Sequence, residues 1–328
     1  MLKTKKVGIV GVGSYLPKKV LTNTDLEKMV DTSDEWIITR TGIKQRRIAA
    51  SNEATSDLAV AAAKKALKKA GVRPKDLELI IVATITPDMQ FPSTACLVQK
   101  ALGAEKAVCF DISAACAGFV YALSTAEKFI LSGAYKNALV VGAEKLSAIT
   151  NWKDRNTCVL FGDGAGACVL APVKSGGIVS TYLAADGSSS DLLTLPAGGS
   201  RLPPSKKTIA NKLHFVHMQG NELFKVAVRA MSEAADKALH QVGLSCKDTD
   251  IFIPHQANMR ILLAVAKKTG LPLGKIYFNI EKYGNMSSAS TAVALCEAVE
   301  SGRIKKGNVV VLDAFGAGLV WGAMVIIW

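Results

Sequence analysis

The chain has 328 residues, of which 49% are hydrophobic and 20% are charged, and its formal net charge is +13. This composition predicts a folded globular protein with one large domain or two closely packed ones. No apolar run approaches the roughly 18–20 residues that span a bilayer. The basic start at residues 1–6 leads into an apolar stretch that glycines interrupt and Pro17 ends. We therefore expect no signal peptide, no membrane insertion and a cytoplasmic location.

The excess of positive charge favours an anionic partner. The sequence contains no zinc-finger, RRM or arginine-rich motif, which argues against nucleic acid. Many lysines also fall within helical segments, where a solvated helix face explains them: Lys64, Lys65, Lys68 and Lys69. A phosphorylated cofactor or an acidic protein suits the charge better.

The seven cysteines are odd in number and form no C-x-x-C pair. This pattern argues against a disulfide framework and against a zinc site. Most of the cysteines are therefore expected to be reduced, small hydrophobic residues of the core.

The first predicted element, Gly8-Ile-Val-Gly11-Val-Gly13, is similar to a dinucleotide-binding loop. However, the third glycine of that motif is missing and Pro17 would break the helix that must follow. No acidic residue closes a following strand either. We therefore reject a dinucleotide site here.

The next elements occur twice in the chain. Residues 57–71 predict an alanine-rich helix closed by Gly71, and residues 79–83 predict a buried strand. The same pattern returns 172 residues later, with a helix at 229–243 and a strand at 251–253. Such regular self-similarity predicts a duplicated unit.

The two halves also end alike. The first ends in a helix, a strand and a glycine-rich turn, at residues 116–131, 138–142 and 161–166. The second ends in the same three elements, at residues 288–300, 309–312 and 315–318. Apolar strands alternating with amphipathic helices predict sheets covered on both faces. We therefore predict an α/β fold of two pseudo-symmetric halves, 1–172 and 173–328, whose equivalent loops converge on one site.

Cys116 is a candidate nucleophile. It follows the strand predicted at 107–111 and stands where a helix is expected to begin. A helix N-terminus favours the thiolate, so we expect the pKa of Cys116 to fall from about 8.5 into the range of roughly 3.5–7.5. The alternative is an inert cysteine packed in the core.

His255 follows the strand at 251–253 in Pro254-His-Gln-Ala-Asn258. Loops at the carboxyl ends of strands are where open α/β sheets place their sites. A histidine with a purely structural role in the loop is the alternative. His214 and His217 lie in an alternating segment and are expected to be strand residues.

Asn285 lies in Tyr283-Gly-Asn-Met, just before the second-half helix that mirrors the Cys116 helix. A Gly-Asn pair before a serine-rich helix start is also ordinary turn and cap chemistry. The duplication nevertheless predicts that Cys116 and Asn285 occupy equivalent places in opposite halves.

Cysteine, histidine and asparagine together admit two mechanisms. In a thiol hydrolase the histidine is a base that activates the cysteine and the asparagine orients it. In a condensing enzyme the histidine and asparagine donate hydrogen bonds to a thioester oxygen that becomes an enolate. Preorganised donors of this kind are worth about 3–4 kcal/mol each. The spacing does not choose between these mechanisms.

Several long motifs in one order give the chain a resemblance over essentially its whole length. They are Gly13–Pro17, Asp31–Ile43, Phe91–Ser93, Ala114–Phe119, Phe161–Gly166, Pro254–Asn258, Gly284–Asn285 and Phe315–Gly318. The chain resembles the 3-oxoacyl-[acyl-carrier-protein] synthase III family, which has the thiolase-like fold with α-β-α-β-α layers. A His/Asn pair resembles these initiating enzymes more than the elongating ones.

The resemblance implies the first condensation of type II fatty acid synthesis. Cys116 would take an acyl group, expected to be acetyl, from acyl-CoA, with the oxyanion held by the amides of Cys116 and Ala317. His255 and Asn285 would then stabilise the enolate formed from malonyl-acyl carrier protein. Neither a metal nor a permanently bound cofactor is implied.

The resemblance also assigns binding residues. The CoA contacts would be Trp36, Arg40, Thr41, Arg155, Asn221 and Asn258, and the carrier-protein contacts Lys225, Arg260, Lys267 and Lys268. Phe161 would gate the site, and Phe91 would enter the acyl pocket of a partner subunit, which implies a homodimer. Ala317 departs from the family's usual Gly-Gly-Gly turn, although its backbone amide is retained.

Three alternatives stay open at this point. A related thiolase-superfamily enzyme would use another acyl acceptor. A Cys-His thioesterase would hydrolyse without malonyl carrier protein, and a non-catalytic CoA- or carrier-binding module would not need Cys116. The length or branching of the primer is not predicted, because one methylene changes selectivity by only about 1–3 kcal/mol.

Overall fold

The computed structural model describes residues 6–328 and builds the chain around two large β-sheets. The first sheet has five strands in the order β1-β7-β6-β4-β5. They are β1 (Lys6–Tyr15), β7 (Asp163–Val173), β6 (Ala138–Lys145), β4 (Leu79–Ala83) and β5 (Val108–Ile112). β4 runs parallel to β5 and β6, whereas β7 runs antiparallel to β6 and β1. The strand predicted at 79–83 is therefore confirmed as β4, in the interior of the sheet.

The second sheet repeats this topology in the order β8-β13-β12-β11. Its strands are β8 (Gly177–Ala185), β13 (Val320–Ile327), β12 (Val309–Gly316) and β11 (Ile251–Pro254). As in the first sheet, the pair β11–β12 is parallel and the other pairs are antiparallel. The fifth strand differs, because the chain beside β11 forms only an isolated parallel bridge, between Ile276 and Phe252, where the first sheet has β5. The short helix α10 (Ile280–Tyr283) follows that bridge.

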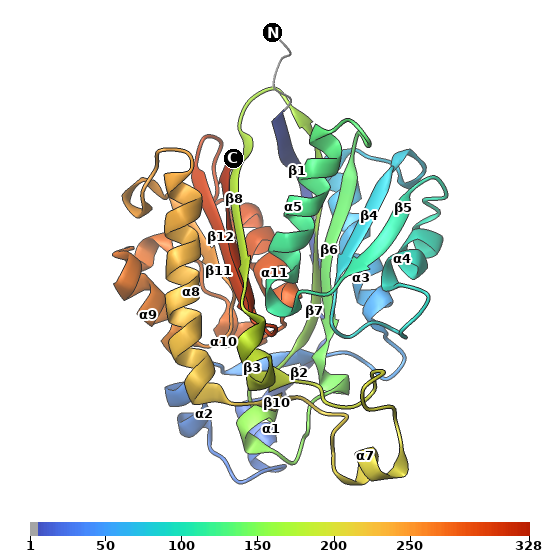
Figure 1. Ribbon diagram of the computed structural model, residues 1–328, viewed down its shortest axis with the longest axis vertical. Helices are drawn as coiled ribbons and strands as arrows, with labels where there is room; N and C mark the ends of the chain where they lie inside the picture. The colour runs from blue at the N-terminus through green and yellow to red at the C-terminus, as the bar shows by residue number, and fades with distance from the viewer. Residues whose placement is uncertain (1–5) are drawn as a thin grey trace.

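The long helices form three layers around these sheets (Figure 1). In the middle layer, α5 (Gly118–Leu131) and α11 (Ser288–Glu300) lie between the two sheets. The outer layers are α3 (Thr55–Ala70) with α4 (Thr94–Leu102), and α8 (Gly220–His240) with α9 (Met259–Thr269). The α-β-α-β-α arrangement of the thiolase-like fold is therefore confirmed.

The middle layer joins the two halves into one core. Phe119 and Leu123 of α5 share a buried cluster with Leu295 of α11 and with strand residues of both sheets. Burying side chains of this size contributes about 1.5–3 kcal/mol each. The first turns of α5 and α11 also meet, since a Cβ added at Gly118 would lie 3.6 Å from the Cβ of Ser288.

The glycine-rich first strand has a packing role. A Cβ at Gly11 or Gly13 would lie 2.5 Å from backbone atoms of Ala66 in α3. Glycine therefore lets α3 approach β1 closely. The chain continues from β1 into another strand, β2 (Lys19–Thr22), instead of the helix that a dinucleotide loop requires.

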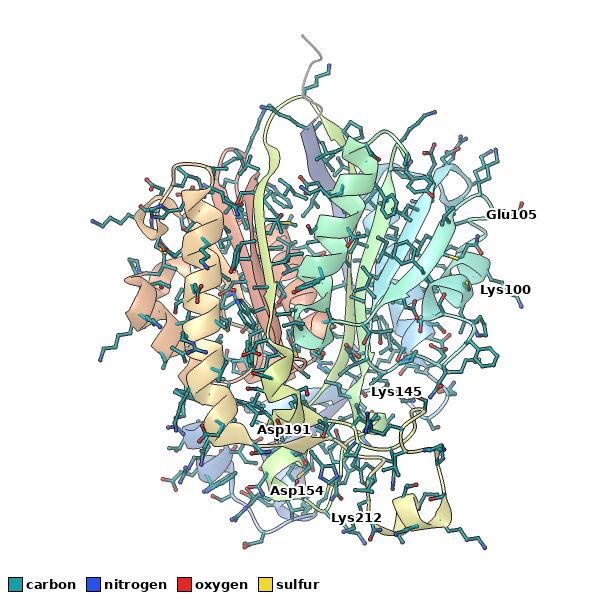
Figure 2. The ribbon with its side chains drawn as sticks, in the orientation of Figure 1. Lys100, Glu105, Lys145, Asp154, Asp191 and Lys212 are labelled. Carbon is teal, nitrogen blue, oxygen red and sulfur yellow. The ribbon has the colours of Figure 1, made fainter. Side chains whose placement is uncertain are left out.

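Shorter elements cover one end of the molecule, the lower end in Figure 1, where Figure 2 labels Asp154, Asp191 and Lys212. They are α1 (Asn23–Glu27), α2 (Asp34–Thr41), β3 (Gln45–Ile48), α6 (Arg155–Cys158), β9 (Leu193–Thr194), α7 (Lys206–Ala210) and β10 (His217–Met218). β2 pairs with β3, and β9 pairs with β10.

Three local predictions are wrong. Helix α8 begins at Gly220 and ends at His240, because the apolar face seen at 229–243 extends back through Leu223. His214 lies in a turn that follows the left-handed residue Lys212, so that only His217 of the two histidines is in a strand. The helix expected to begin at Cys116 begins two residues later, at Gly118.

In the described part of the chain, no helix is both long and apolar enough to cross a membrane. Most of the basic start of the sequence, residues 1–5, lies outside the described residues.

Candidate active site

One cavity of about 780 Å³ is lined by Cys116, His255 and Asn285 together. The three residues come from different segments: the turn before α5, the end of β11 and the loop after α10. The structure thus brings the sequence-predicted trio to one place between the two sheets, and it gives the cavity an opening lined by residues of α2, α8 and α9.

Cys116 lies in a short 3-10 turn, Ala115–Ala117, directly before α5. Ala115 has a φ of +43°, a left-handed conformation that costs a residue with a Cβ on the order of 1 kcal/mol. Gly316 packs against this turn, because a Cβ there would lie 2.6 Å from the backbone nitrogen of Cys116. The end of β12 therefore reaches the nucleophile's amide only because residue 316 is glycine, and Ala317 follows immediately.

Burial raises the pKa of the Cys116 thiol to about 12. The neighbouring Ser287 side chain lowers the pKa and buried Glu144 raises it further, but the loss of solvent dominates. The predicted depression of the pKa by a helix N-terminus is therefore wrong for the free enzyme. The thiol is 8% exposed, and a helix start cannot offset that desolvation.

His255 is held by its backbone and by its neighbour Gln256. The His255 amide donates to the carbonyl of Asp313 on β12 at 2.6 Å. The Gln256 carboxamide accepts from the amides of Asn279 and Ile280 and donates to the carbonyl of Pro254. Every polar atom of that buried side chain is thus engaged in fixing the loop on which His255 sits.

Burial lowers the pKa of His255 to about 3. Its side chain is 1% exposed, and neither ring nitrogen has a hydrogen-bond partner among residues 6–328. The imidazole is therefore neutral at physiological pH, with one N–H available to donate.

Asn285 is oriented by two sets of hydrogen bonds. Its amide donates to the carbonyl of Leu160 and its carbonyl accepts from the amide of Gly162, which bracket Phe161. Its side-chain oxygen accepts from the amide of Ser287 at 2.8 Å. Because that oxygen is engaged, the side-chain NH₂ is the group left to donate.

This geometry separates the two mechanisms that the sequence left open. A hydrolase needs an asparagine that orients the histidine as a base. Here the Asn285 oxygen bonds to Ser287, and within the described chain His255 is bonded to neither Cys116 nor Asn285. Two uncommitted N–H donors beside a thiol favour the condensing arrangement.

The residues predicted to contact CoA lie at the opening of the cavity. Its lining includes Trp36, Arg40, Thr41, Asn221 and Asn258. The Arg155 guanidinium lies 4.9 Å from the centre of the Trp36 ring, and that of Arg40 lies 5.8 Å from it.

Three of these side chains already have partners within the protein. The Arg155 guanidinium donates to the carbonyl of Asp31 at 2.8 Å. The Thr41 hydroxyl donates to the carbonyl of Ile37 and accepts from the amide of Ile43. The Asn258 side chain caps α9 through the amide of Arg260 and donates to the carbonyl of Arg40.

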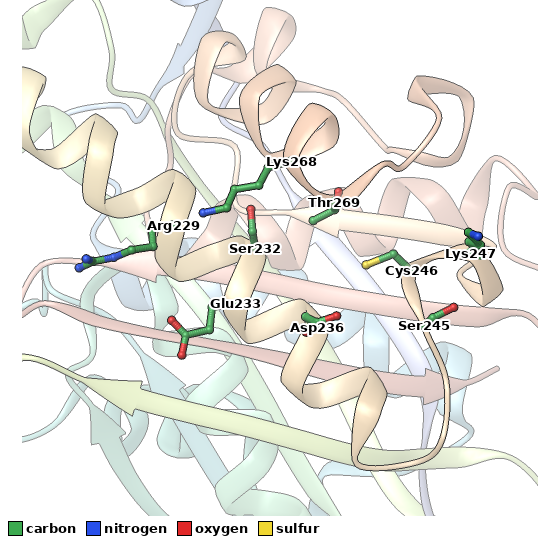
Figure 3. A pocket seen from close by; sticks show the side chains of 9 residues that line it. All are labelled: Arg229, Ser232, Glu233, Asp236, Ser245, Cys246, Lys247, Lys268 and Thr269. Atoms are coloured by element: carbon green, nitrogen blue, oxygen red, sulfur yellow. The ribbon is translucent and has the colours of Figure 1, made fainter.

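The four residues predicted to bind the carrier protein lie on α8 and α9. Lys225 and Arg260 line the main cavity, and the Arg260 guanidinium lies 5.7 Å from the centre of the Phe224 ring. Lys267 is on the last turn of α9. Lys268 instead lines a separate cavity of about 570 Å³ between α8 and α9, together with Arg229 and Cys246 (Figure 3).

Phe161 is 7% exposed and does not belong to the residues that line the main cavity. Its backbone pairs with Asn285, which places it beside the site. Phe91 is far more exposed to solvent, at 85%.

Sequence reasoning missed two buried charged residues behind the site. Glu144 accepts hydrogen bonds from the hydroxyls of Thr86 and Ser288 and from the amide of Ile85. Arg46 donates to the carbonyls of Val159 and Leu21, beneath the loop that holds Asn285. The sequence does indicate one of these residues, because Glu144 is a charged residue at the end of an apolar strand, in Gly142-Ala-Glu144.

A thiol and two hydrogen-bond donors around one cavity, in a duplicated thiolase-like fold, define a condensing acyltransferase. The family model for 3-oxoacyl-[acyl-carrier-protein (ACP)] synthase III matches residues 110–187. The family model for the C-terminal part of the same enzyme matches residues 239–328. A β-ketoacyl-[acyl-carrier-protein] synthase III of Caldanaerobacter subterraneus subsp. tengcongensis is 58% identical over 322 residues, which cover 98% of this chain and 97% of the relative.

Solved structures agree with these matches. The crystal structure of 3-oxoacyl-[acyl-carrier-protein] synthase III from Aquifex aeolicus VF5 has a TM-score of 0.91 at 50% identity, covering 99% of this chain and 100% of that one. The crystal structure of the priming β-ketosynthase from the R1128 polyketide pathway has a TM-score of 0.92 at 35% identity, and the match covers 100% of this chain and 98% of that one. The chain therefore belongs to the 3-oxoacyl-[acyl-carrier-protein] synthase III family.

Proposed function

We propose that the protein catalyses the initiating condensation of type II fatty acid synthesis, joining an acyl-CoA primer, acetyl-CoA by preference, to malonyl-acyl carrier protein. The observation that carries this proposal is the shared cavity, lined by a thiol and by two side chains whose N–H groups have no partner among residues 6–328.

In the first half-reaction, the Cys116 sulfur attacks the thioester carbonyl of acyl-CoA. The amides of Cys116 and Ala317 hold the oxyanion, and the C–S bond to CoA then breaks. The thiol proton leaves with the CoA sulfur, so no free thiolate has to persist in the buried site. The close approach of Gly316 to the Cys116 amide supports this pair of donors.

In the second half-reaction, His255 and Asn285 donate to the thioester oxygen of malonyl-acyl carrier protein. Loss of CO₂ leaves an enolate on that oxygen, and its carbon attacks the acyl-Cys116 carbonyl. The Cys116 sulfur departs as a thiolate, which takes up a proton from solvent, and 3-oxoacyl carrier protein is released. His255 acts here as a neutral imidazole that donates its one N–H.

For the CoA nucleotide, Trp36 and Arg155 would stack on the adenine while Arg40 and Thr41 contact the nucleotide and Asn221 and Asn258 the pantetheine. A base between two stacked groups needs about 7 Å, since stacked atoms lie about 3.5 Å apart. The present gap is 4.9 Å. Arg155 must therefore swing away from the carbonyl of Asp31, to which it donates, when CoA enters.

For the carrier protein, Lys225, Arg260, Lys267 and Lys268 would form the docking face, with Phe161 gating the path to the thiol. The net charge of +13 suits an acidic partner. The R1128 priming enzyme of a polyketide pathway is 35% identical to this chain, whereas the β-ketoacyl-[acyl-carrier-protein] synthase III of Caldanaerobacter is 58% identical. We therefore assign the fatty acid carrier protein as acceptor by preference over a specialised one.

We further propose a cytoplasmic homodimer whose protomers each consist of two halves, 1–172 and 173–328. β5 is the last strand of its sheet, and Val108, Met89 and Phe91 nearby are exposed. Pairing of two β5 edges would cover these side chains and bring Phe91 to the partner's acyl pocket.

Intact mass spectrometry after incubation with acetyl-CoA tests the first half-reaction. We expect one acetyl adduct in the wild type and in Cys246→Ser, and none in Cys116→Ser. We expect His255→Ala to acylate normally but to decarboxylate malonyl-acyl carrier protein about 10²–10³-fold more slowly. Hydrolysis of acyl-CoA without malonyl carrier protein would instead identify a thioesterase.

A further inference from the structure

Two thiols outside the active site lie side by side. The sulfur atoms of Cys96, on α4, and Cys109, on β5, are 3.4 Å apart. Both residues are half-buried and neither forms a disulfide. They lie at the outer edge of the first sheet, where Figure 2 labels Lys100 on the same helix and Glu105 in the turn that leads to β5.

The segments that carry the two thiols are tied together on both sides of the pair. At the start of α4, the amides of Thr94 and Ala95 donate to the Asp111 carboxylate at 2.7 and 2.8 Å. Further along the helix, the Gln99 side chain donates to the carbonyl of Ala107 at 2.8 Å. The two sulfurs are therefore held facing each other between fixed points, instead of meeting by chance on mobile loops.

The two sulfurs have different surroundings. The Ser93 hydroxyl donates to the Cys96 sulfur at 3.2 Å. Burial and the adjacent Cys96 raise the pKa of Cys109 to about 11, so that Cys109 is a neutral thiol at physiological pH. A neutral Cys109 does not repel the sulfur beside it as a thiolate would.

We propose that Cys96 and Cys109 form a redox modification site, which a peroxide oxidises to an intramolecular disulfide and a thiol reductant restores. Cys96 first gives its sulfur electrons to hydrogen peroxide, whose O–O bond breaks, leaving a sulfenic acid and one water. The Cys109 thiol then displaces the second water and the S–S bond forms.

The geometric demand of that bond is small. The sulfurs must close from 3.4 Å to about 2.05 Å. The disulfide would staple α4 to the edge strand. Because α4 starts directly after Phe91, Pro92 and Ser93, it would also fix one end of the segment that carries Phe91.

The test is peptide mapping without reductant, after the full-length protein is treated with hydrogen peroxide. We expect a cross-linked pair of peptides that contain Cys96 and Cys109, lighter by two hydrogen atoms than the reduced pair, which dithiothreitol restores. Cys96→Ser and Cys109→Ser should each abolish it. Cys246→Ser is the matched control, since it removes another half-buried cysteine and should leave the link intact.

Thermal unfolding gives a second readout. Closing this short loop should raise the Tm of the oxidised wild type by roughly 5 °C, and of neither single variant. Oxidation to sulfinic acids without a 96–109 link, a link only between two chains, or a lowered Tm would overturn the proposal. None of these readouts depends on the condensing activity, so the two proposals can fail separately.

Discussion

His255, the proposed hydrogen-bond donor of the site, shows how burial alone sets the charge of a side chain. Its pKa of about 3 comes from desolvation, with no charged neighbour responsible. In the unfolded chain the same group titrates near 6.5. Between pH 3 and pH 6.5, the unfolded chain therefore binds a proton on His255 that the folded chain does not bind. This difference lowers the free energy of unfolding below pH 6.5 and has no effect above it.

The free energy of unfolding should consequently fall as the pH drops below 6.5, by up to about 1.4 kcal/mol per pH unit from this one residue. His255→Gln removes that contribution, so its stability should decline less steeply than that of the wild type between pH 6.5 and 4.5. Urea unfolding at a series of pH values measures the slopes. His217→Gln, a change at an exposed histidine, should keep the wild-type slope. Parallel curves for His255→Gln and the wild type would contradict the argument.

At this scale the sequence predicts residue identities better than their electrostatics. Cys116, His255 and Asn285 can be found from their motifs, because each follows a recognisable strand, turn or repeat. The pKa of Cys116 cannot, because it depends on burial by segments such as the end of β12, distant in the chain. The hydrogen bond from the Ser287 amide that fixes the side chain of Asn285 cannot be predicted from the sequence either.

Among the elements, the contact between α3 and β1 depends on the absence of side chains. A Cβ at Gly13 would lie 2.5 Å from the backbone nitrogen of Ala66, and backbone atoms cannot rotate aside. The sequence shows glycines at 8, 11 and 13 but not which helix needs them. Their resemblance to a nucleotide loop is therefore misleading until the packing is known.

Gly13→Ala should lower the free energy of unfolding by about 1–3 kcal/mol or more, because the added methyl separates α3 from the strand. Gly187→Ala is the control, since nothing lies within 4 Å of a Cβ there and its φ is not left-handed. Chemical denaturation of both variants gives the comparison. Equal stabilities would show that α3 can retreat without cost.

Over the whole molecule, the exposed edge of β5 is the surface where the proposed homodimer would form. An edge strand presents unpaired N–H and C=O groups, and a lysine on such an edge opposes pairing. Val108 is 48% exposed at the start of this strand. The duplication predicted the two sheets, but it did not predict that the second would lack the equivalent of β5 and so lack this edge.

Val108→Lys should therefore shift the protein toward monomer in sedimentation velocity at micromolar concentration. Leu273→Lys changes a side chain that is 53% exposed elsewhere and should leave the association unchanged. A dimer that survives Val108→Lys would place the interface on another surface.

The left-handed residue before Cys116 has a counterpart in the other half. Shifted by 172 positions, Ala115 becomes Ser287, whose φ is +47° against +43°, and Cys116 becomes Ser288. The predicted equivalence of Cys116 and Asn285 is therefore wrong, because Asn285 lies three residues before the counterpart of Cys116. Two copies of one elbow thus survive, yet the second carries a hydroxyl bonded to Glu144 in place of a thiol. The two turns share one backbone conformation, but the Ser288 hydroxyl binds buried Glu144 where Cys116 presents its thiol to the cavity. Separating residues 1–172 from residues 173–328 would leave Cys116 and His255 on different polypeptides, neither of which holds the whole cavity lining.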